Sequence, residues 1–356
     1  MGLKGRSREQ REKNEANRWN RVLQGGLLGR LGPNITRRAA SARIAPMKPF
    51  SSTLLIAVLV LALQQTAAGQ RERAPFASPL PGSGPTQMRP YGQSAGCSEE
   101  PTAFHRCALE KMKTFNPPRT PDGKPDFTGF WNRIVVRNME NIEEHPQTMD
   151  TSGGTSSIID PADGKIPYQP WAAAKRDEMF ATYVNPMALC MPLGSPKQAY
   201  GPGAFRVVQT PASVFMINDF AHAYRVIPTD GRPHVGPAIR LYVGDSRGRW
   251  DGNTLVIDVT NQKDKIWLDA VGNFFSERVH VVERFTMIDN NVIHYEATVD
   301  DPNVYTRPWT MVSGWKRNMD TPLEIWESAC WEGIQQELEN ATYGHQHYPG
   351  APALPR

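Results

Sequence analysis

Residues 279–299 read VHVVERFTMIDNNVIHYEATV, and this stretch carries the clearest fold signal in the chain. Two runs rich in Val, Ile, Phe, Tyr and Thr, 279–287 and 292–299, flank the turn-forming triplet Asp289-Asn290-Asn291. β-branched and aromatic residues favour strands, and Asp and Asn tolerate the backbone angles that tight hairpins need. The stretch therefore predicts a β-hairpin.

Similar short runs continue on both sides of this hairpin. A first strand is expected within residues 127–136. The further expected strands cover 206–209, 214–219, 223–227, 239–243, 254–259, 309–316 and 323–329, with a turn expected at 245–248. Evenly spaced short strands are typical of antiparallel sheets, and closure removes their exposed edges. We therefore predict a mainly β fold, an antiparallel meander that closes or nearly closes into a β-barrel.

Composition divides the chain into five parts. Residues 1–46 are a basic extension, consistent with a misassigned start codon, and 47–69 resemble a signal peptide. The Pro- and Gly-rich residues 70–125 predict an exposed, disordered arm with one short helix near 103–113. Residues 126–335 form the predicted barrel domain, in which 170–183 favours a helix that begins at Pro170. Residues 336–356 form a polar tail.

The charge of the chain is concentrated in its leader. The formal net charge is +4, yet residues 1–69 hold 12 Lys or Arg and 3 Glu, so the remainder has a net charge of −5. A mildly acidic domain gives no support for nucleic-acid binding. We therefore expect no nucleic-acid partner.

The leader has the pattern of an export signal. Lys48 precedes ten consecutive apolar residues at 54–63, and Ala67-Ala68-Gly69 offers a small-residue cleavage site before Gln70. Ten helical residues span about 15 Å, roughly half of a bilayer core. We predict a periplasmic or secreted protein without a permanent membrane span. The alternative is an inner-membrane anchor formed by an uncleaved signal.

Four cysteines agree with export. An even number in an oxidising compartment predicts disulfides, and four cysteines allow three pairings. The favoured pairing joins Cys97 to Cys107 and Cys190 to Cys330. The alternative is four unrelated thiols.

A polar cluster in the middle of the domain could carry acid–base chemistry. Its candidate catalytic residues are Asp219, His222, Arg225, Asp230 and His234. A histidine could shuttle a proton while a carboxylate orients its ring, and Arg225 could stabilise an oxyanion. The structural alternative is that 230–232 is an ordinary turn and that the charges form internal links.

Aromatic residues could line a pocket for an apolar ligand. The candidate ligand-binding residues are Trp131, Tyr224, Trp250, Glu283 and Trp309. The expected strands carry polar residues on both faces, which fits a barrel with a partly polar interior pocket. The alternative is that the aromatic side chains simply fill the core.

The sequence lacks the familiar motifs of cofactor and nucleophile sites. No Walker A, GxGxxG or CxxCH motif occurs, and His280 and Glu283 would lie on opposite faces of a strand, so we expect no cofactor and no metal. Ser246 fits G-x-S-x-G, but a strand rather than a helix follows, which argues against a hydrolase elbow.

Several motifs together resemble one protein family. Residues 120–131 (TPDGKPDFTGFW) resemble the TPDGKPDLSGxW opening of a large group of secreted bacterial proteins of uncharacterised function. Residues 160–171 (DPADGKIPYQPW), 190–196 (CMPLGSP) and 244–255 (GDSRGRWDGNTL) are similar to further stretches of that group. The resemblance implies export and a lipocalin-like barrel, and Gly129-Phe130-Trp131 is similar to the Gly-x-Trp that opens many lipocalins.

These observations lead to one functional prediction and one alternative. The prediction is an exported barrel whose pocket takes a hydrophobic, oxygenated small molecule of aromatic, polycyclic or isoprenoid type. Acid–base chemistry would make it a cofactor-independent lyase, isomerase or hydrolase. The alternative is a lipocalin-like carrier that binds such a ligand without changing it.

Overall fold

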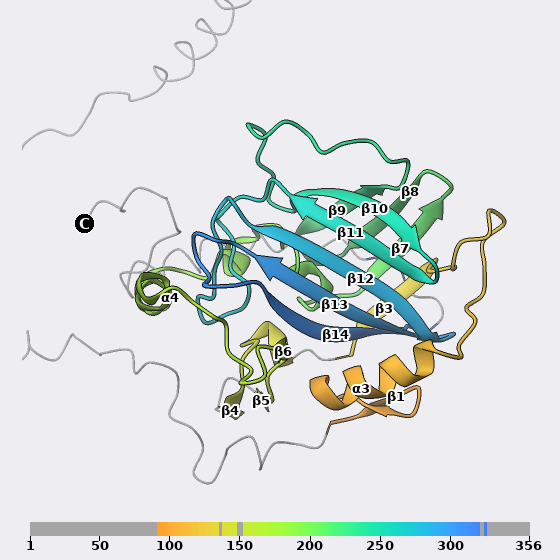
Figure 1. Cartoon of the computed structure of the whole chain (residues 1–356), viewed down its shortest axis with the longest axis horizontal. Coiled ribbons are helices and arrows are strands. Elements are labelled where there is room, and N and C mark those ends of the chain that lie inside the picture. Colours follow the sequence, from red (N-terminus) through yellow and green to blue (C-terminus); the bar gives the residue numbers. More distant parts are fainter. Residues whose placement is uncertain (1–90, 135–136, 148–151, 321–323, 326–356) are drawn as a thin grey trace, which may run out of the picture. The chain divides into compact units, whose positions relative to one another are not determined.

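Nine antiparallel strands form one continuous, strongly curved sheet in the computed structural model (Figure 1). The structure describes residues 91–134, 137–147, 152–320 and 324–325. In spatial order the strands are β10 (Asp245–Asp251), β11 (Thr254–Thr260), β12 (His280–Asp289), β13 (Val292–Asp300), β14 (Trp309–Arg317), β3 (Gly129–Arg133), β7 (Phe205–Thr210), β8 (Ser213–Asn218) and β9 (Tyr224–Pro228). The short β6 (Ile158–Asp160) also pairs with β14. The predicted, nearly closed antiparallel barrel is confirmed.

The two end strands of this sheet, β9 and β10, face each other without a backbone ladder. Because every neighbouring pair is antiparallel and the number of strands is odd, β9 and β10 run in the same direction. Parallel strands need a long crossover, and residues 229–244 supply it. We call the gap between β9 and β10 the seam, and residues 229–244 the strap.

Aromatic side chains fill the barrel interior. Trp131, Phe205, Phe285, Tyr295 and Trp315 are all buried. Ring centroids lie 4.0 Å apart for Phe205 and Trp315 and 4.6 Å apart for Phe285 and Trp315. Tilted or edge-on pairs of this kind add about 0.5–1.5 kcal/mol each beyond the burial of their surface. This packing fixes the strands that carry the site.

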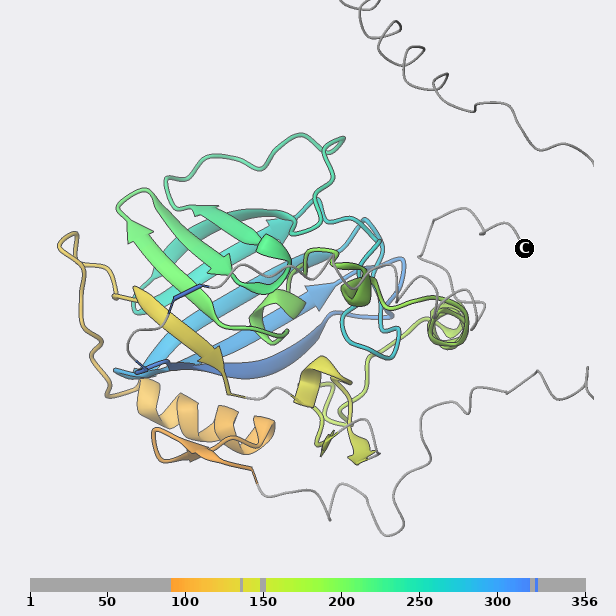
Figure 2. The ribbon, with the colours of Figure 1, turned by 180° about the vertical axis from the view of Figure 1, so that it is seen from behind.

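Within the described residues, two α-helices lie outside the barrel. Helix α3 (Pro101–Met112) packs below it in Figures 1 and 2 and buries Phe104 and Ala108. Gly314 on β14 allows this contact, since an added Cβ would lie 2.6 Å from the Phe104 ring. Residues 101–112 therefore pack on the domain, whereas the sequence predicted an exposed arm there. Helix α4 (Pro170–Thr182) forms where it was predicted.

The described part also contains short 3-10 helices, among them η2 (Arg137–Met139), η3 (Pro186–Leu189) and η4 (Lys197–Ala199), and two small hairpins. The hairpins are β1 (Gln93–Ser94) with β2 (Cys97–Ser98), and β4 (His145–Gln147) with β5 (Ser152–Gly154). The Cys97–Cys107 disulfide, predicted from the sequence, ties β2 to α3. Cys190 is also disulfide-bonded, while Cys330 lies outside the described residues. These disulfides are consistent with an oxidising compartment.

Two of the sequence predictions around the strap are wrong. The expected strand at 239–243 belongs to the strap, and the expected turn at 245–248 is the beginning of β10. Gly248 suggested a turn, but in the structure it lets β10 approach β9 closely. An added Cβ at Gly248 would lie 2.8 Å from Ile227 Cγ2 across the seam. Glycine within a strand often marks such a close approach.

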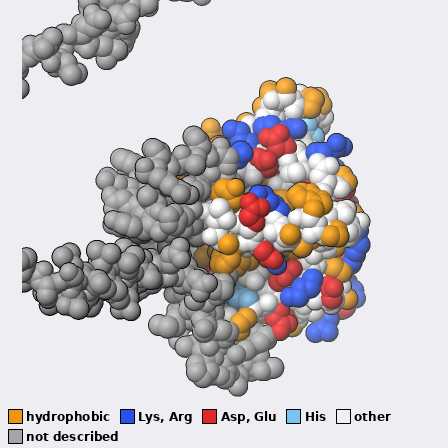
Figure 3. Space-filling view, turned by 90° about the vertical axis from the view of Figure 1, so that its left-hand side faces the viewer, with side chains coloured by type: hydrophobic (Ala, Val, Ile, Leu, Met, Phe, Trp, Pro, Cys, Tyr) orange, Lys and Arg blue, Asp and Glu red, His pale blue; other side chains and the backbone are white. Residues whose placement is uncertain are grey.

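The visible surface of the described residues carries charges of both signs. On the face in Figure 3, acidic and basic side chains alternate with apolar ones. Among the described residues, none of the helices has the length and apolar character needed to cross a membrane. The predicted signal peptide at 47–69, the start of the arm and the tail at 336–356 lie outside the described residues.

Candidate functional site

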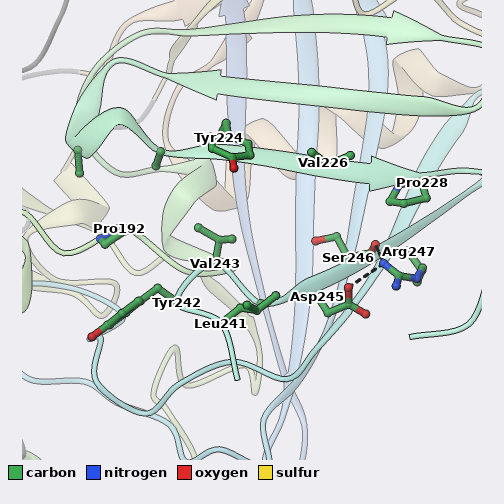
Figure 4. Close-up of a pocket in the computed structure, with 13 residues that line it drawn as sticks. Pro192, Tyr224, Val226, Pro228, Leu241, Tyr242, Val243, Asp245, Ser246 and Arg247 are labelled. Carbon is green, nitrogen blue, oxygen red and sulfur yellow. Dashed lines mark hydrogen bonds and ion pairs between the residues drawn. The ribbon is translucent and has the colours of Figure 1, made fainter. Parts of the chain in front are cut away.

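A pocket of about 450 Å³ opens along the seam (Figure 4). Ligand pockets commonly enclose about 300–1,000 Å³, so a small organic molecule fits this size class. β9 contributes one wall, the end of the strap a second, and the start of β10 the third. The lining residues are Pro192, Ala221, Ala223, Tyr224, Val226, Pro228, Leu241, Tyr242, Val243, Gly244, Asp245, Ser246 and Arg247.

The walls of the seam pocket are largely apolar. Tyr224 and Val226 alternate along β9 on the outer face, and Leu241 faces them from the strap (Figure 4). Tyr224 is 68% exposed, Val226 41% and Leu241 37%. Large apolar side chains that remain exposed beside a concave surface are typical of binding sites. The pocket thus offers an apolar lining at the molecular surface.

A buried polar network lies behind the pocket. Arg225 on β9 donates through Nε to Ser246 Oγ at 2.7 Å and forms an ion pair with Glu283 on β12. Tyr295 donates its hydroxyl to Glu283 Oε1 at 2.8 Å. Burial, reinforced by the Glu283 charge, raises the pKa of Tyr295 well above its usual value. Tyr295 therefore stays a neutral donor, and the network holds Arg225 against Ser246.

Ser246 links this network to the pocket. Its oxygen accepts a hydrogen bond from Arg225, and no other hydrogen bond of Ser246 Oγ occurs within the described part of the chain. The hydroxyl proton is therefore available to an acceptor in the pocket, and the guanidinium polarises the hydroxyl as a donor. Arg225 would act on a ligand through Ser246.

The outer rim of the pocket carries a chain of charges. Arg247 donates to Asp245 Oδ1 at 2.7 Å, and His234 Nδ1 lies 2.7 Å from Asp245 Oδ2. His234 Nε2 lies 2.8 Å from Asp258 Oδ1, and His280 Nε2 lies 2.9 Å from Asp258 Oδ2. The hydrogen bond with His280 lowers the pKa of Asp258 and raises that of His280.

The predicted catalytic residues do not form one cluster. Arg225 and His234 lie in the two groups just described. Asp219 accepts from the Ala204 amide at 3.2 Å, and the exposed Asp230 pairs with Arg232, whose hydrogen bonds lower the pKa of Asp230 to about 2. His222 ends the short helix η5 (Phe220–His222), and its side chain lies outside the described part.

The predicted ligand-binding residues also lie in different parts of the structure. Tyr224 lines the pocket, and Glu283 belongs to the network behind it. Trp131 and Trp309 are fully buried in the core, where Trp131 Nε1 donates to the Phe127 carbonyl at 2.8 Å. Trp250 is partly buried and packs against Phe127 with ring centroids 5.5 Å apart.

Sequence reasoning did not select five polar residues that the structure places at the site: Asp245, Ser246, Arg247, Asp258 and Tyr295. Asp245 and Arg247 were assigned to a turn. Asp258 stands directly opposite Arg247 in the β10–β11 register, a pairing that appears only once the strand boundaries are known. The available sequence signal was that charged residues occupy alternate positions in neighbouring strands, which places their side chains on one face of the sheet.

A second pocket, of about 560 Å³, lies beside the 119–128 loop and the β7–β8 turn. It is larger than the seam pocket, but no residue of the buried polar network lines it, whereas Ser246 of that network lines the seam pocket. Its walls include Arg119, Asp122 and Thr120, which bond to one another or to nearby backbone. We therefore take the seam pocket as the candidate site.

Comparisons with known proteins identify no relative, so the functional proposal rests on the geometry of the site. No protein-family model matches the chain, and no curated protein matches it closely enough to serve as a relative.

Proposed function

We propose that this protein binds a small amphipathic molecule in the seam pocket, with an apolar body and at least one hydrogen-bond-accepting oxygen. The observation that carries the proposal is Ser246, a donor fixed by a buried ion pair at the base of a largely apolar pocket. Apolar pockets with a few placed polar groups are the usual form of small-molecule sites. A carbonyl, hydroxyl or carboxylate oxygen would lie toward Ser246.

Acid–base catalysis is the second candidate, favoured by the position of His234. Its ring touches Asp245, which lines the pocket, so a proton could pass between the ring and a ligand through that carboxylate. Arg225 would stabilise developing negative charge only through Ser246, because its own contacts go to Ser246 and Glu283. A lyase, isomerase or hydrolase without a cofactor remains the corresponding enzyme class.

Fluorescence titration tests the binding proposal with two matched probes. N-phenyl-1-naphthylamine is neutral, whereas 1-anilinonaphthalene-8-sulfonate adds a sulfonate to the same aromatic scaffold. Tyr224→Ala removes an apolar wall and is expected to weaken both probes about tenfold, as loss of about 1.5 kcal/mol of buried surface implies. Ser246→Ala is expected to weaken the sulfonate probe more than the neutral one.

Trp171→Ala is the control for this titration. Trp171 is 55% exposed on α4 and does not line the seam pocket. Its replacement should leave both affinities unchanged. Equal losses in Trp171→Ala and Tyr224→Ala, or no binding of either probe, would contradict the proposal. Native mass spectrometry of the purified protein would then identify any natural ligand that is retained, and an altered ligand after incubation would favour the enzyme.

Export is part of the proposed function. The signal-like residues 47–69, the resemblance to secreted proteins and the Cys97–Cys107 disulfide support it. Intact mass measurement of the protein from the periplasm should give a chain that begins at Gln70. A full-length chain in the inner-membrane fraction would instead support the uncleaved anchor.

A further inference from the structure

The first part of the strap makes a cluster of contacts with the barrel around His234. His234 lies between Asp245 on β10 and Asp258 on β11, at 2.7 and 2.8 Å, so both ring nitrogens face carboxylate oxygens. Two further bonds join at the same point: the Val235 amide donates to Asp245 Oδ2 at 3.0 Å, and Arg247 Nε donates to the Pro233 carbonyl at 2.8 Å. We call this arrangement the His234 clasp.

A separate set of bonds holds the second part of the strap. Asn261 Nδ2 donates to the carbonyls of Gly236 and Ile239 at 3.0 and 2.9 Å. The Leu241 amide donates to the Asn261 carbonyl at 2.9 Å. These groups do not titrate. The second part of the strap is therefore held independently of His234, by these bonds and by an ion pair between Arg240 and Glu277 at 3.4 Å.

The protonation state of His234 decides whether both of its contacts are favourable. An ionised carboxylate oxygen accepts hydrogen bonds but cannot donate them. Both contacts are therefore attractive only when each ring nitrogen carries a proton. When the ring loses one proton, a nitrogen lone pair faces a carboxylate oxygen, and one charge-assisted bond is replaced by a repulsive contact.

The charged groups around His234 come from every neighbouring element. Asp245 and Arg247 face it from β10, and Asp258 from β11. His280 on β12 donates to the far oxygen of Asp258. On the strap itself, Asp230 and Arg232 bond to each other. Protonated His234 and Arg247 together balance the charges of Asp245 and Asp258, and loss of the His234 proton lowers the net charge at the pocket rim by one unit.

We infer that the His234 clasp is a proton-operated control of the seam pocket, which pins the strap and neutralises the pocket rim when the ring is protonated. The inference rests on the proposed function, because it concerns ligand binding at the same pocket. Ligands with an anionic oxygen are bound below the pH at which the clasp loses its proton, and are bound more weakly above it.

Hydrogen exchange of the Val235 amide measures the clasp without any ligand. We expect its protection factor, corrected for intrinsic exchange, to fall about tenfold or more from pH 5.5 to pH 8.5, as loss of a bond to a charged group implies. The Leu241 amide, bonded to Asn261, is the internal reference and should keep its protection. Equal behaviour of the two amides would overturn the inference.

Three variants separate a proton-operated clasp from a merely structural contact. His234→Gln should abolish the pH dependence of Val235 protection. Asp258→Asn should reverse it, because the Asn amide can donate to the unprotonated Nε2 while its oxygen still accepts from His280. His280→Gln removes a titrating ring from the same carboxylate without touching the strap, and should keep the dependence. An Asp258→Asn variant that behaves like the wild type would refute the mechanism.

The two probes then connect the clasp to binding. The sulfonate probe should bind roughly three- to tenfold more weakly at pH 8.5 than at pH 5.5, as one added unit of negative charge beside a partly solvated site implies. The neutral probe should change less, and His234→Gln should remove the difference. If neither probe binds at any pH, the proposed function fails. If both bind with no pH dependence while Tyr224→Ala weakens them, the proposed function stands and this inference fails.

Discussion

Replacing either partner of the buried Arg225–Glu283 pair should destabilise the protein strongly, and replacing both should cost less than the two single losses added together. The two side chains are 2% and 0% exposed. For a hydrogen-bonded ion pair at an effective dielectric constant of about 20, the attraction is roughly 5 kcal/mol, much of which offsets the cost of removing both charges from water. Removing one partner leaves the other charge buried without compensation, which typically costs about 3–5 kcal/mol.

Glu283→Gln and Arg225→Met should therefore each lower the free energy of unfolding by about 3–5 kcal/mol. The Glu283→Gln substitution keeps the shape of the side chain and a hydrogen bond to Tyr295, so the loss reports charge rather than volume. In the double variant no uncompensated charge remains. Its destabilisation should be smaller than the sum of the single effects by about 2–3 kcal/mol, the upper range for residues in contact.

Urea denaturation at pH 7, followed by tryptophan fluorescence, gives these free energies. Arg232→Met is the matched control, because it breaks the exposed Asp230–Arg232 pair and should leave the denaturation midpoint unchanged. Additive losses in the double variant, or single losses no larger than the control, would refute the view that this pair is an electrostatic unit behind Ser246.

Three further predictions concern the rest of the barrel. Burial lowers the pKa of His294 to about 3, so as the pH drops below about 6.5 the unfolded chain takes up a proton before the folded chain does, and the free energy of unfolding falls. Between pH 7 and pH 4, urea denaturation should show that the wild type loses about 3 kcal/mol more than His294→Phe. Replacing Cys97 and Cys107 by Ala opens a short loop and should cost about 3 kcal/mol in the same assay, and the difference from wild type should disappear when both are measured in reductant. Gly248→Val drives a side chain into Ile227 across the seam and should cost about 1–3 kcal/mol and weaken probe binding, whereas full probe affinity would show that the close approach does not shape the pocket.

The barrel could be predicted from sequence because its signals are local. The hairpin at 279–299 contains its own turn and both of its strands, and β12 and β13 form there as predicted. The same holds for the Cys97–Cys107 disulfide, whose partners are ten residues apart. Such features need no knowledge of the remainder of the chain.

The site could be predicted only in part because its contacts are distant in sequence. Arg225 and Glu283 were both selected as candidates, but 58 residues separate them, and nothing in either segment indicates that they pair. His234 was also selected, with Asp219 or Asp230 as its carboxylate, whereas the carboxylates beside it are Asp245 and Asp258. The sequence shows which polar residues are present, but which of them pair depends on the register of the strands.

The origin of the site lies in the odd number of strands. An even antiparallel barrel would bring antiparallel edges together, and a short hairpin and a regular ladder could close it. With nine strands the edges are parallel, and the chain must cross over between them. That crossover is the strap, which supplies one wall of the pocket and carries His234. Alternation along β10 then turns Ser246 toward the buried network and Asp245 and Arg247 toward the strap. A fixed donor inside and a titratable clasp outside therefore meet on one strand, at the one place where the described sheet does not close.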